Sequence, residues 1–251
     1  MSESELRIFA DPTEMAEAGA ELLVHLAREA QTAGRPFSVA LSGGSTPRTM
    51  LALLASDAFR DRIDWDAIEL FWSDERAVPP DDPQSNYGMA KAALLDHVPV
   101  PPTRIHRMPA EQTPLVTVAD AYAAEIRRTL GVGRARTPQL DLVMLGMGPD
   151  GHTASLLPET SALEDRHRLV AANRVPKLNA DRLTFTPKLI NAAAHVLLLV
   201  AGEDKAAALH EVLEGERRPL LYPAQLVAPE SGSLYWFVDR AAAVGLATRS
   251  S

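Results

Sequence analysis

Asp150 and His152 are the residues whose types and spacing point most directly to chemistry, because they stand two positions apart in a glycine-rich turn. A histidine gains and loses its proton near neutral pH, so it can act as a general base. The turn follows the apolar run 142–145, and open α/β sheets bind ligands in polar loops at the ends of buried strands. We therefore expect this turn to carry chemistry; a turn that only exposes a solvated histidine is the alternative.

The same turn contains Gly146, Gly148 and Gly151, which spell the G-x-G-x-x-G pattern of dinucleotide-binding loops. Two features disfavour a nicotinamide cofactor. Asp150 would place a carboxylate where the pyrophosphate should lie. The apolar residues 169–172 stand where an acidic residue should hold the ribose.

A second candidate element is the segment Ser42-Gly-Gly-Ser-Thr-Pro47, which follows the apolar residues 37–41. Glycines let backbone N–H groups converge, hydroxyl groups can donate hydrogen bonds, and the start of a helix is electropositive. These properties indicate a cradle for an anion, formed by Ser42, Gly43, Gly44, Ser45 and Thr46. The alternative is that the hydroxyl groups only cap the helix that follows.

Two further polar groups follow apolar runs. Asp74 and Arg76 come after residues 68–72, and Lys205 comes after residues 195–200. Each group could be a solvated part of the surface or part of a site. For Asp74 and Arg76, repetition at the ends of predicted strands favours a site, because the carboxyl ends of parallel strands meet at one edge of a sheet. For Lys205 the two alternatives stay open.

The elements that must position these residues alternate as strand, polar loop and helix along the chain. This order predicts a three-layer α/β/α fold with a mainly parallel central sheet, in which Val39, Leu70, Val143 and Leu198 lie on neighbouring strands. Less regular segments give four local expectations: a first strand at 7–10, a polar loop at 73–76, a strand at 104–106 and a helix that opens at 153–157.

Composition excludes several classes of function. The 251 residues suit a single domain spanning 1–251, and the 46% of apolar residues can form a full core. The absence of cysteine excludes disulfides, thiolate catalysis and cysteine-based metal sites. The net charge of −8 argues against a nucleic-acid surface, and no stretch suits a signal peptide or a membrane span. We expect a cytoplasmic protein that binds neither nucleic acid nor membranes.

Several motifs follow one another in a fixed order: Leu41-Ser-Gly-Gly-Ser-Thr-Pro47, Trp72-Ser-Asp-Glu-Arg-Ala-Val-Pro79, Ser85-Asn-Tyr87, Leu145-Gly-Met-Gly-Pro-Asp-Gly-His-Thr-Ala-Ser-Leu-Leu-Pro158, Arg182-Leu-Thr-Phe-Thr186 and Val200-Ala-Gly-Glu-Asp-Lys205. Together they resemble the 6-phosphogluconolactonase family over about residues 5–240. Phe185 and residues 174–181 depart from the family pattern. The resemblance implies hydrolysis of 6-phospho-D-glucono-1,5-lactone to 6-phosphogluconate in the pentose phosphate pathway, without an organic cofactor. It also implies a Rossmann-like three-layer α/β/α fold.

The resemblance also implies a role for each candidate residue. His152 is the general base, and Asp74, Arg76 and Asp150 line the reacting end. The substrate- and phosphate-binding residues are Ser42, Gly43, Gly44, Ser45, Thr46, Asn86, Arg182 and Lys205. Arg76 either stabilises the oxyanion or orients ring hydroxyl groups, and the sequence does not choose between a monomer and a dimer. Asp150 and His152 are too few for the three ligands of a catalytic zinc ion, so we expect no metal.

The chemistry agrees with this resemblance. A δ-lactone is an activated ester, so water can attack it directly and no nucleophilic side chain is required. The helix expected after His152 would disfavour the protonated imidazole and keep a neutral base.

Two rival functions would use the same phosphate cradle. An aldose–ketose isomerase or deaminase acting on an amino-sugar phosphate belongs to a family that places a glutamate shortly after its histidine, where this chain has Ser155-Leu-Leu-Pro158. A sugar-phosphate-binding regulator has no need for a histidine beside carboxylates and an arginine.

Overall fold

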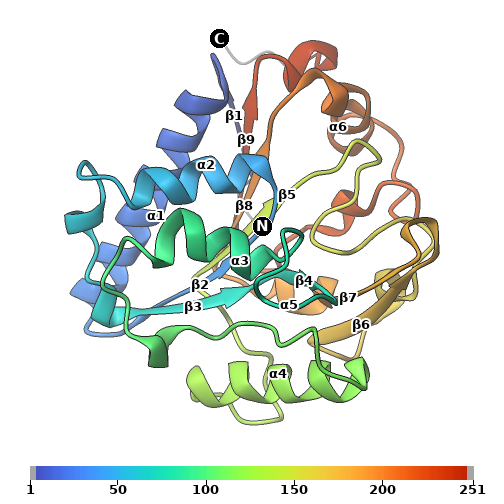
Figure 1. The fold of residues 1–251 in the computed structure, drawn as a ribbon. Helices are drawn as coiled ribbons and strands as arrows, with labels where there is room; N and C mark the ends of the chain where they lie inside the picture. Colours follow the sequence, from blue (N-terminus) through green and yellow to red (C-terminus); the bar gives the residue numbers. More distant parts are fainter. Residues whose placement is uncertain (1–3, 248–251) are drawn as a thin grey trace.

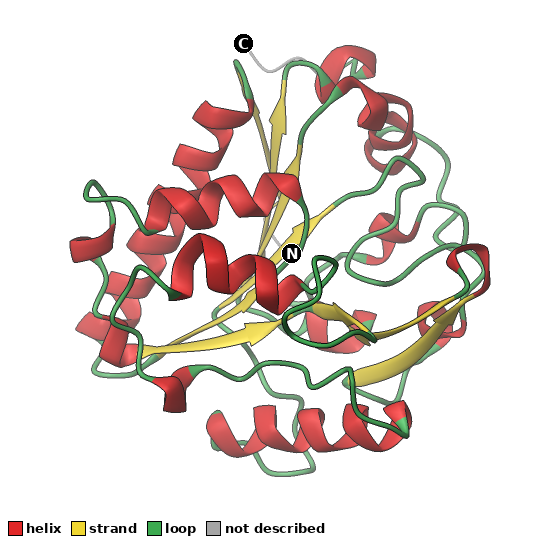
Figure 2. Cartoon of the chain, viewed as in Figure 1, coloured by secondary structure: helices red, strands yellow, loops and turns green. Residues whose placement is uncertain are grey.

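The computed structural model describes residues 4–247, and its frame is a six-stranded sheet in the order β1-β9-β8-β5-β2-β3 (Figure 1). Every neighbouring pair in this large sheet is parallel. Its strands are β1 Ser4–Phe9, β2 Phe37–Leu41, β3 Ile68–Trp72, β5 Leu142–Gly146, β8 His195–Val200 and β9 Ser233–Asp239. The inner strands are rich in apolar residues because helices cover both faces of the sheet (Figure 2).

A second, smaller sheet has the order β4-β7-β6 and is antiparallel. Its strands are β4 Asp74–Arg76, β6 Val170–Val175 and β7 Ala180–Phe185. The expected polar loop at 73–76 is therefore wrong for its last three residues. The chain leaves β3, passes through Ser73 and continues directly into β4, because β7 offers a strand edge with which residues 74–76 pair.

The helices are α1 Pro12–Thr32, α2 Ser45–Leu54, α3 Asn86–Ala90, α4 Leu115–Thr129, α5 Pro187–Asn191 and α6 Ala206–Leu213. A π-helical turn, Lys91–Leu95, extends α3. Single 3-10 turns lie at Arg60–Arg62, Trp65–Ala67, Pro102–Arg104, Ser161–Glu164, Pro176–Leu178, Glu203–Lys205, Pro223–Leu226 and Ala242–Gly245. Over residues 4–247, no helix combines the length and the apolar character needed to cross a bilayer.

The parallel sheet confirms the predicted fold class. Val39 pairs with Leu70, and β8, β5, β2 and β3 lie side by side, so the strands that carry Val39, Leu70, Val143 and Leu198 are neighbours as expected. Helices α1 and α2 pack on each other and against this sheet, while α4 packs on β6 of the small sheet (Figure 1). Asp11 caps the start of α1, since its carboxylate accepts hydrogen bonds from the N–H groups of Thr13 and Glu14.

Three local expectations are wrong or too short. Residues 104–106 form no strand, because the two prolines before them lead into a 3-10 turn and leave one isolated bridge between Ile105 and Leu70. The first strand begins at Ser4, since its parallel pairing with β9 extends back to that residue. No helix opens at 153–157: Ala154 has a left-handed backbone, with φ of +48°, and the chain instead forms a turn closed by a Thr153–Leu156 bridge.

Tyr122 joins α4 to the edge of the large sheet. Its side chain is fully buried, and its hydroxyl accepts a hydrogen bond from the N–H of Trp72 at 3.0 Å and donates one to the carbonyl of His106 at 2.7 Å. The hydroxyl thus satisfies a backbone N–H at the last residue of β3, directly before the residues that enter the small sheet.

Replacing Tyr122 with Phe should leave the N–H of Trp72 buried without a partner. Such a loss costs about 1–3 kcal/mol, so we expect the free energy of unfolding in urea to fall by that amount. Tyr235→Phe is the control, because the Tyr235 hydroxyl makes no hydrogen bond to any residue within 4–247. Equal losses in the two variants would show that the hydroxyl bridge adds nothing.

Candidate active site

A polar cavity of about 340 Å³ lies where the carboxyl ends of β2, β5 and β8 meet the small sheet. It brings together every predicted site residue except Asp150. Its lining consists of Ser42, Gly43, Gly44, Ser45, Thr46, Pro47, Asp74, Arg76, Asn86, Gly146, Met147, Gly148, His152, Ala154, Arg182, Leu199, Ala201, Asp204 and Lys205. Residues from both sheets and from loops far apart in the sequence therefore face one space.

Asp150 supports His152 and does not itself line the cavity. The ring Nδ1 of His152 donates to Oδ1 of Asp150 at 2.5 Å, and this hydrogen bond lowers the pKa of Asp150 to about 2. An ionised carboxylate on Nδ1 fixes the tautomer of the ring and leaves Nε2 to act on a ligand. Because no helix follows His152, the expected helix dipole is absent, and the Asp150 carboxylate is the group that orients the imidazole.

Gly148 makes room for this pair. A Cβ atom at position 148 would lie 2.1 Å from both Nδ1 and Cε1 of the His152 ring. The N–H of Gly148 also donates to the carbonyl of His152 at 2.9 Å, which closes the turn. The glycine pattern that suggests a dinucleotide loop thus has a different physical basis here, since the histidine ring packs directly on the backbone.

Asp74 is buried and held from two sides. Ser155 donates its hydroxyl to Oδ2 at 2.6 Å, and the side-chain amide of Asn86 donates to Oδ1 at 3.2 Å and to the carbonyl of Asp74 at 2.9 Å. Ser155 is itself fixed to the small sheet by Thr184, whose hydroxyl accepts from the N–H of Ser155, and by the side chain of Asn173. No local sequence pattern identifies the role of Ser155, because its partners are distant in the chain.

Arg76 and Arg182 stand directly opposite each other on β4 and β7. The pKa of Arg182 is lowered, first by burial and then by the positive charge of Arg76. The Nε atoms of both guanidinium groups are buried and have no hydrogen-bond partner among residues 4–247. Two neighbouring cations with unused donors form a site for an anion.

The predicted anion cradle starts α2. The N-cap residue is Gly44, with φ of +103°, and no side chain caps this helix. The capping alternative for the hydroxyl groups is therefore wrong, and Ser45 and Thr46 lie in the first turn and line the cavity. Lys205 also lines the cavity, where its Nζ contacts Oδ2 of Asp204 at 2.5 Å. The glycine-rich loop, its hydroxyl groups and one lysine thus line the same cavity as the arginine pair.

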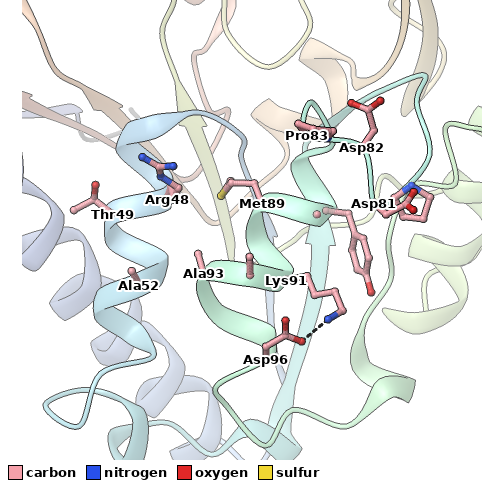
Figure 3. A pocket seen from close by; sticks show the side chains of 14 residues that line it. Arg48, Thr49, Ala52, Asp81, Asp82, Pro83, Met89, Lys91, Ala93 and Asp96 are labelled. Carbon is pink, nitrogen blue, oxygen red and sulfur yellow. Dashed lines mark hydrogen bonds and ion pairs between the residues drawn. The ribbon is translucent and has the colours of Figure 1, made fainter.

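A larger groove of about 980 Å³ lies between α2 and α3 and does not share this chemistry (Figure 3). Figure 3 shows Arg48 and Thr49 on one wall, with Met89 and Ala93 on the other. The described lining of the groove contains no histidine and no glycine-rich loop, and Lys91 in it is paired with Asp96 at 2.5 Å. The larger volume of this groove therefore does not make it the functional site.

Within residues 4–247 no group of three or more His, Asp and Glu side chains is placed to hold a metal ion.

Comparisons with known proteins point to one family. The sequence model of the family described as glucosamine-6-phosphate isomerases/6-phosphogluconolactonase matches residues 10–236. A 6-phosphogluconolactonase of Nostoc sp. is 41% identical over 211 residues, covering 84% of this chain and 85% of that protein. One of Streptomyces coelicolor is 37% identical, covering 95% and 93%. The solved 6-phosphogluconolactonase of Trypanosoma cruzi superposes with a TM-score of 0.86 at 28% identity and covers 98% of each chain.

Gly148→Ala should separate His152 from Asp150, because the added methyl group would overlap the ring. We expect the low-field NMR signal of the Nδ1 proton to disappear and the free energy of unfolding to fall by about 1–3 kcal/mol. Gly146→Ala is the matched control, since a Cβ at position 146 meets no atom within 4 Å. A Gly148→Ala protein that keeps the Nδ1 signal would contradict the packing described for this turn.

Proposed function

This chain belongs to the glucosamine-6-phosphate isomerase/6-phosphogluconolactonase family and is a lactone hydrolase, and we propose that its substrate is 6-phospho-D-glucono-1,5-lactone. The product would be 6-phospho-D-gluconate, formed in the oxidative pentose phosphate pathway. The observation that carries this proposal is one cavity that combines an Asp150-oriented histidine with a cluster of anion-binding groups. Hydrolysis of a phosphorylated neutral ester requires both a general base and a site for the phosphate.

We assign the proton transfers to His152. Nε2 takes a proton from water as the oxygen of that water bonds to C1 of the lactone. The bond between C1 and the ring oxygen then breaks, and the imidazolium returns the proton to the departing ring oxygen. Asp150 stabilises the imidazolium through Nδ1, as the 2.5 Å hydrogen bond allows. General base catalysis of this kind contributes about 10²–10⁴-fold to the rate.

The phosphate group would lie among the cradle at the start of α2, Arg182 and Lys205. Because Arg76 stands opposite Arg182 on the neighbouring strand, we propose that it also binds the phosphate, in preference to the oxyanion or the ring hydroxyl groups. Asp74 would partly neutralise these cations and accept a hydrogen bond from the sugar. A histidine base and a pre-built anion site require no organic cofactor.

The surroundings of His152 favour a hydrolase over the isomerase or deaminase. Moving a proton between C1 and C2 requires a carboxylate over C2 of the sugar. The positions after the turn are Leu156 and Leu157, both buried, while Glu159 lies beyond Pro158. A regulator without turnover would retain the anion site but would not need the His152–Asp150 pair.

Turnover tests the proposal directly. Purified protein should accelerate hydrolysis of the phosphorylated lactone well above its spontaneous rate and release no ammonia from glucosamine 6-phosphate. Ammonia release at a rate rivalling lactone hydrolysis would reassign the protein to the deaminases. Binding of the lactone without acceleration would reassign it to the regulators.

His152→Ala should lower kcat for the lactone by about 10²–10⁴-fold and change KM little, because the base acts in the transition state. Spontaneous hydrolysis must be subtracted in this assay. His25→Ala, which changes an exposed histidine of α1, is the control and should retain wild-type kinetics. A kcat within a few-fold of wild type in His152→Ala would exclude His152 as the base.

Arg182→Ala should mainly raise KM, because the phosphate is held similarly in the ground state and in the transition state. Arg174→Ala is a matched control on the neighbouring strand, since Arg174 is exposed and pairs with Asp181. Steady-state kinetics separate the two parameters. A lower kcat with unchanged KM in Arg182→Ala would place this residue at the reacting carbonyl instead.

A further inference from the structure

Glu75 lies between two residues that line the cavity but does not line it itself. Successive side chains of a strand point to opposite faces, so Glu75 on β4 points away from the face that carries Asp74 and Arg76. Its side chain is buried, with 2% of the residue exposed. Burial raises the pKa of Glu75, although hydrogen bonds from three backbone N–H groups oppose that shift. Burying a carboxylate costs free energy unless hydrogen bonds replace the water that it loses.

The carboxylate of Glu75 binds the start of α3 to β4. Oε1 accepts from the N–H of Arg76 at 2.8 Å and from the N–H of Asn86 at 2.7 Å. Oε2 accepts from the N–H of Tyr87 at 2.8 Å and from the hydroxyl of Ser85 at 3.1 Å. Each oxygen therefore faces two donors, and one side chain binds three backbone N–H groups and one hydroxyl group.

The position of Asn86 decides two features of the cavity. Its amide nitrogen donates to Asp74, as described above. Its Oδ1 lies so close to the anion cradle that a Cβ at Gly43 would stand 1.8 Å away. That oxygen is buried and has no hydrogen-bond partner in the described chain, so the side chain is held there by its amide hydrogen bonds to Asp74, by packing and by the backbone. A shift of the Asn86 backbone would remove these hydrogen bonds from Asp74 and change the packing of the side chain against the cradle.

We propose that Glu75 is a positioning residue of this enzyme, which holds Asn86 and Arg76 in the geometry that the substrate requires. This assignment rests on the proposed lactone hydrolysis. Glu75 touches no reacting atom and acts through the residues that it places. Misplacement of catalytic groups by about 1 Å can cost about 10²-fold in rate.

The test compares Glu75→Gln with Glu69→Gln. Gln has the shape of Glu but presents N–H groups to two of the four donors at position 75. Glu69 is a matched control because it is a buried carboxylate in β3, bonded to Arg104 and His106 and absent from the cavity lining. With unfolding followed in parallel, kcat/KM per folded protein should fall by about 10–10²-fold in Glu75→Gln and stay within about twofold of wild type in Glu69→Gln.

A double-mutant cycle separates positioning from general destabilisation. On an Asn86→Ala background, Glu75→Gln should cause a smaller further loss than it causes in the wild-type protein, because one of the two residues that Glu75 positions has lost its side chain. Losses that multiply independently would overturn the proposal, as would wild-type kcat/KM in Glu75→Gln. If Glu75→Gln does not fold, Glu75→Asp keeps the charge but shortens the reach, and it should show the same loss.

A structural measurement makes this test independent of the reaction. In a crystal structure of Glu75→Gln, or of Glu75→Asp, the amide of Asn86 should leave its hydrogen bond to Asp74 while β4 keeps its pairing with β7. An unmoved Asn86 would refute the role of Glu75 whatever the substrate is. Wild-type protein without lactone turnover would refute the proposed function and leave the displacement of Asn86 as the measure of this inference.

Discussion

Ser73 joins the two sheets through two backbone hydrogen bonds, and the cavity exists because of that junction. Its N–H donates to the carbonyl of Leu41 in the large sheet at 2.8 Å, and its carbonyl accepts from the N–H of Phe185 in the small sheet at 2.7 Å. The hydroxyl of Ser73 adds a second contact to Leu41 at 3.0 Å. The chain thus crosses between the sheets within a single residue. Parallel strands supply the glycine-rich loops, and the antiparallel sheet supplies the arginine pair and Asp74.

The charges of the cavity run against those of the whole chain. The protein carries a net charge of −8, yet Arg76, Arg182 and Lys205 gather in one small space. Asp74 lies among them and Glu75 lies behind them, so the cations are partly balanced before any ligand arrives. Selectivity for an anionic group then comes from the local positions of these cations. It does not depend on the sign of the overall charge.

Sequence patterns predicted the parts of this fold that depend on local information. The predicted strands 37–41, 68–72 and 195–200 match β2, β3 and β8, because strands buried on both faces need mostly apolar residues. Asp150 and His152 could be singled out because both stand in one short turn. Strand β4 was not predicted, since its pairing of Asp74 with Thr184 spans a distance in sequence that no local pattern encodes. The roles of Ser155 and Glu75 depend on that same distant pairing. The helix expected at 153–157 failed because the left-handed Ala154 reverses the chain.

A crystal structure of the protein with 6-phospho-D-gluconate, the product of the proposed reaction, tests the assignment of the cavity most directly. The phosphate should contact Arg182, Lys205 and the first turn of α2, and the C1 carboxylate should lie within hydrogen-bond distance of Nε2 of His152. Product seated in the groove between α2 and α3, or bound in the cavity with its two ends exchanged, would contradict this assignment of residues to the two ends of the substrate.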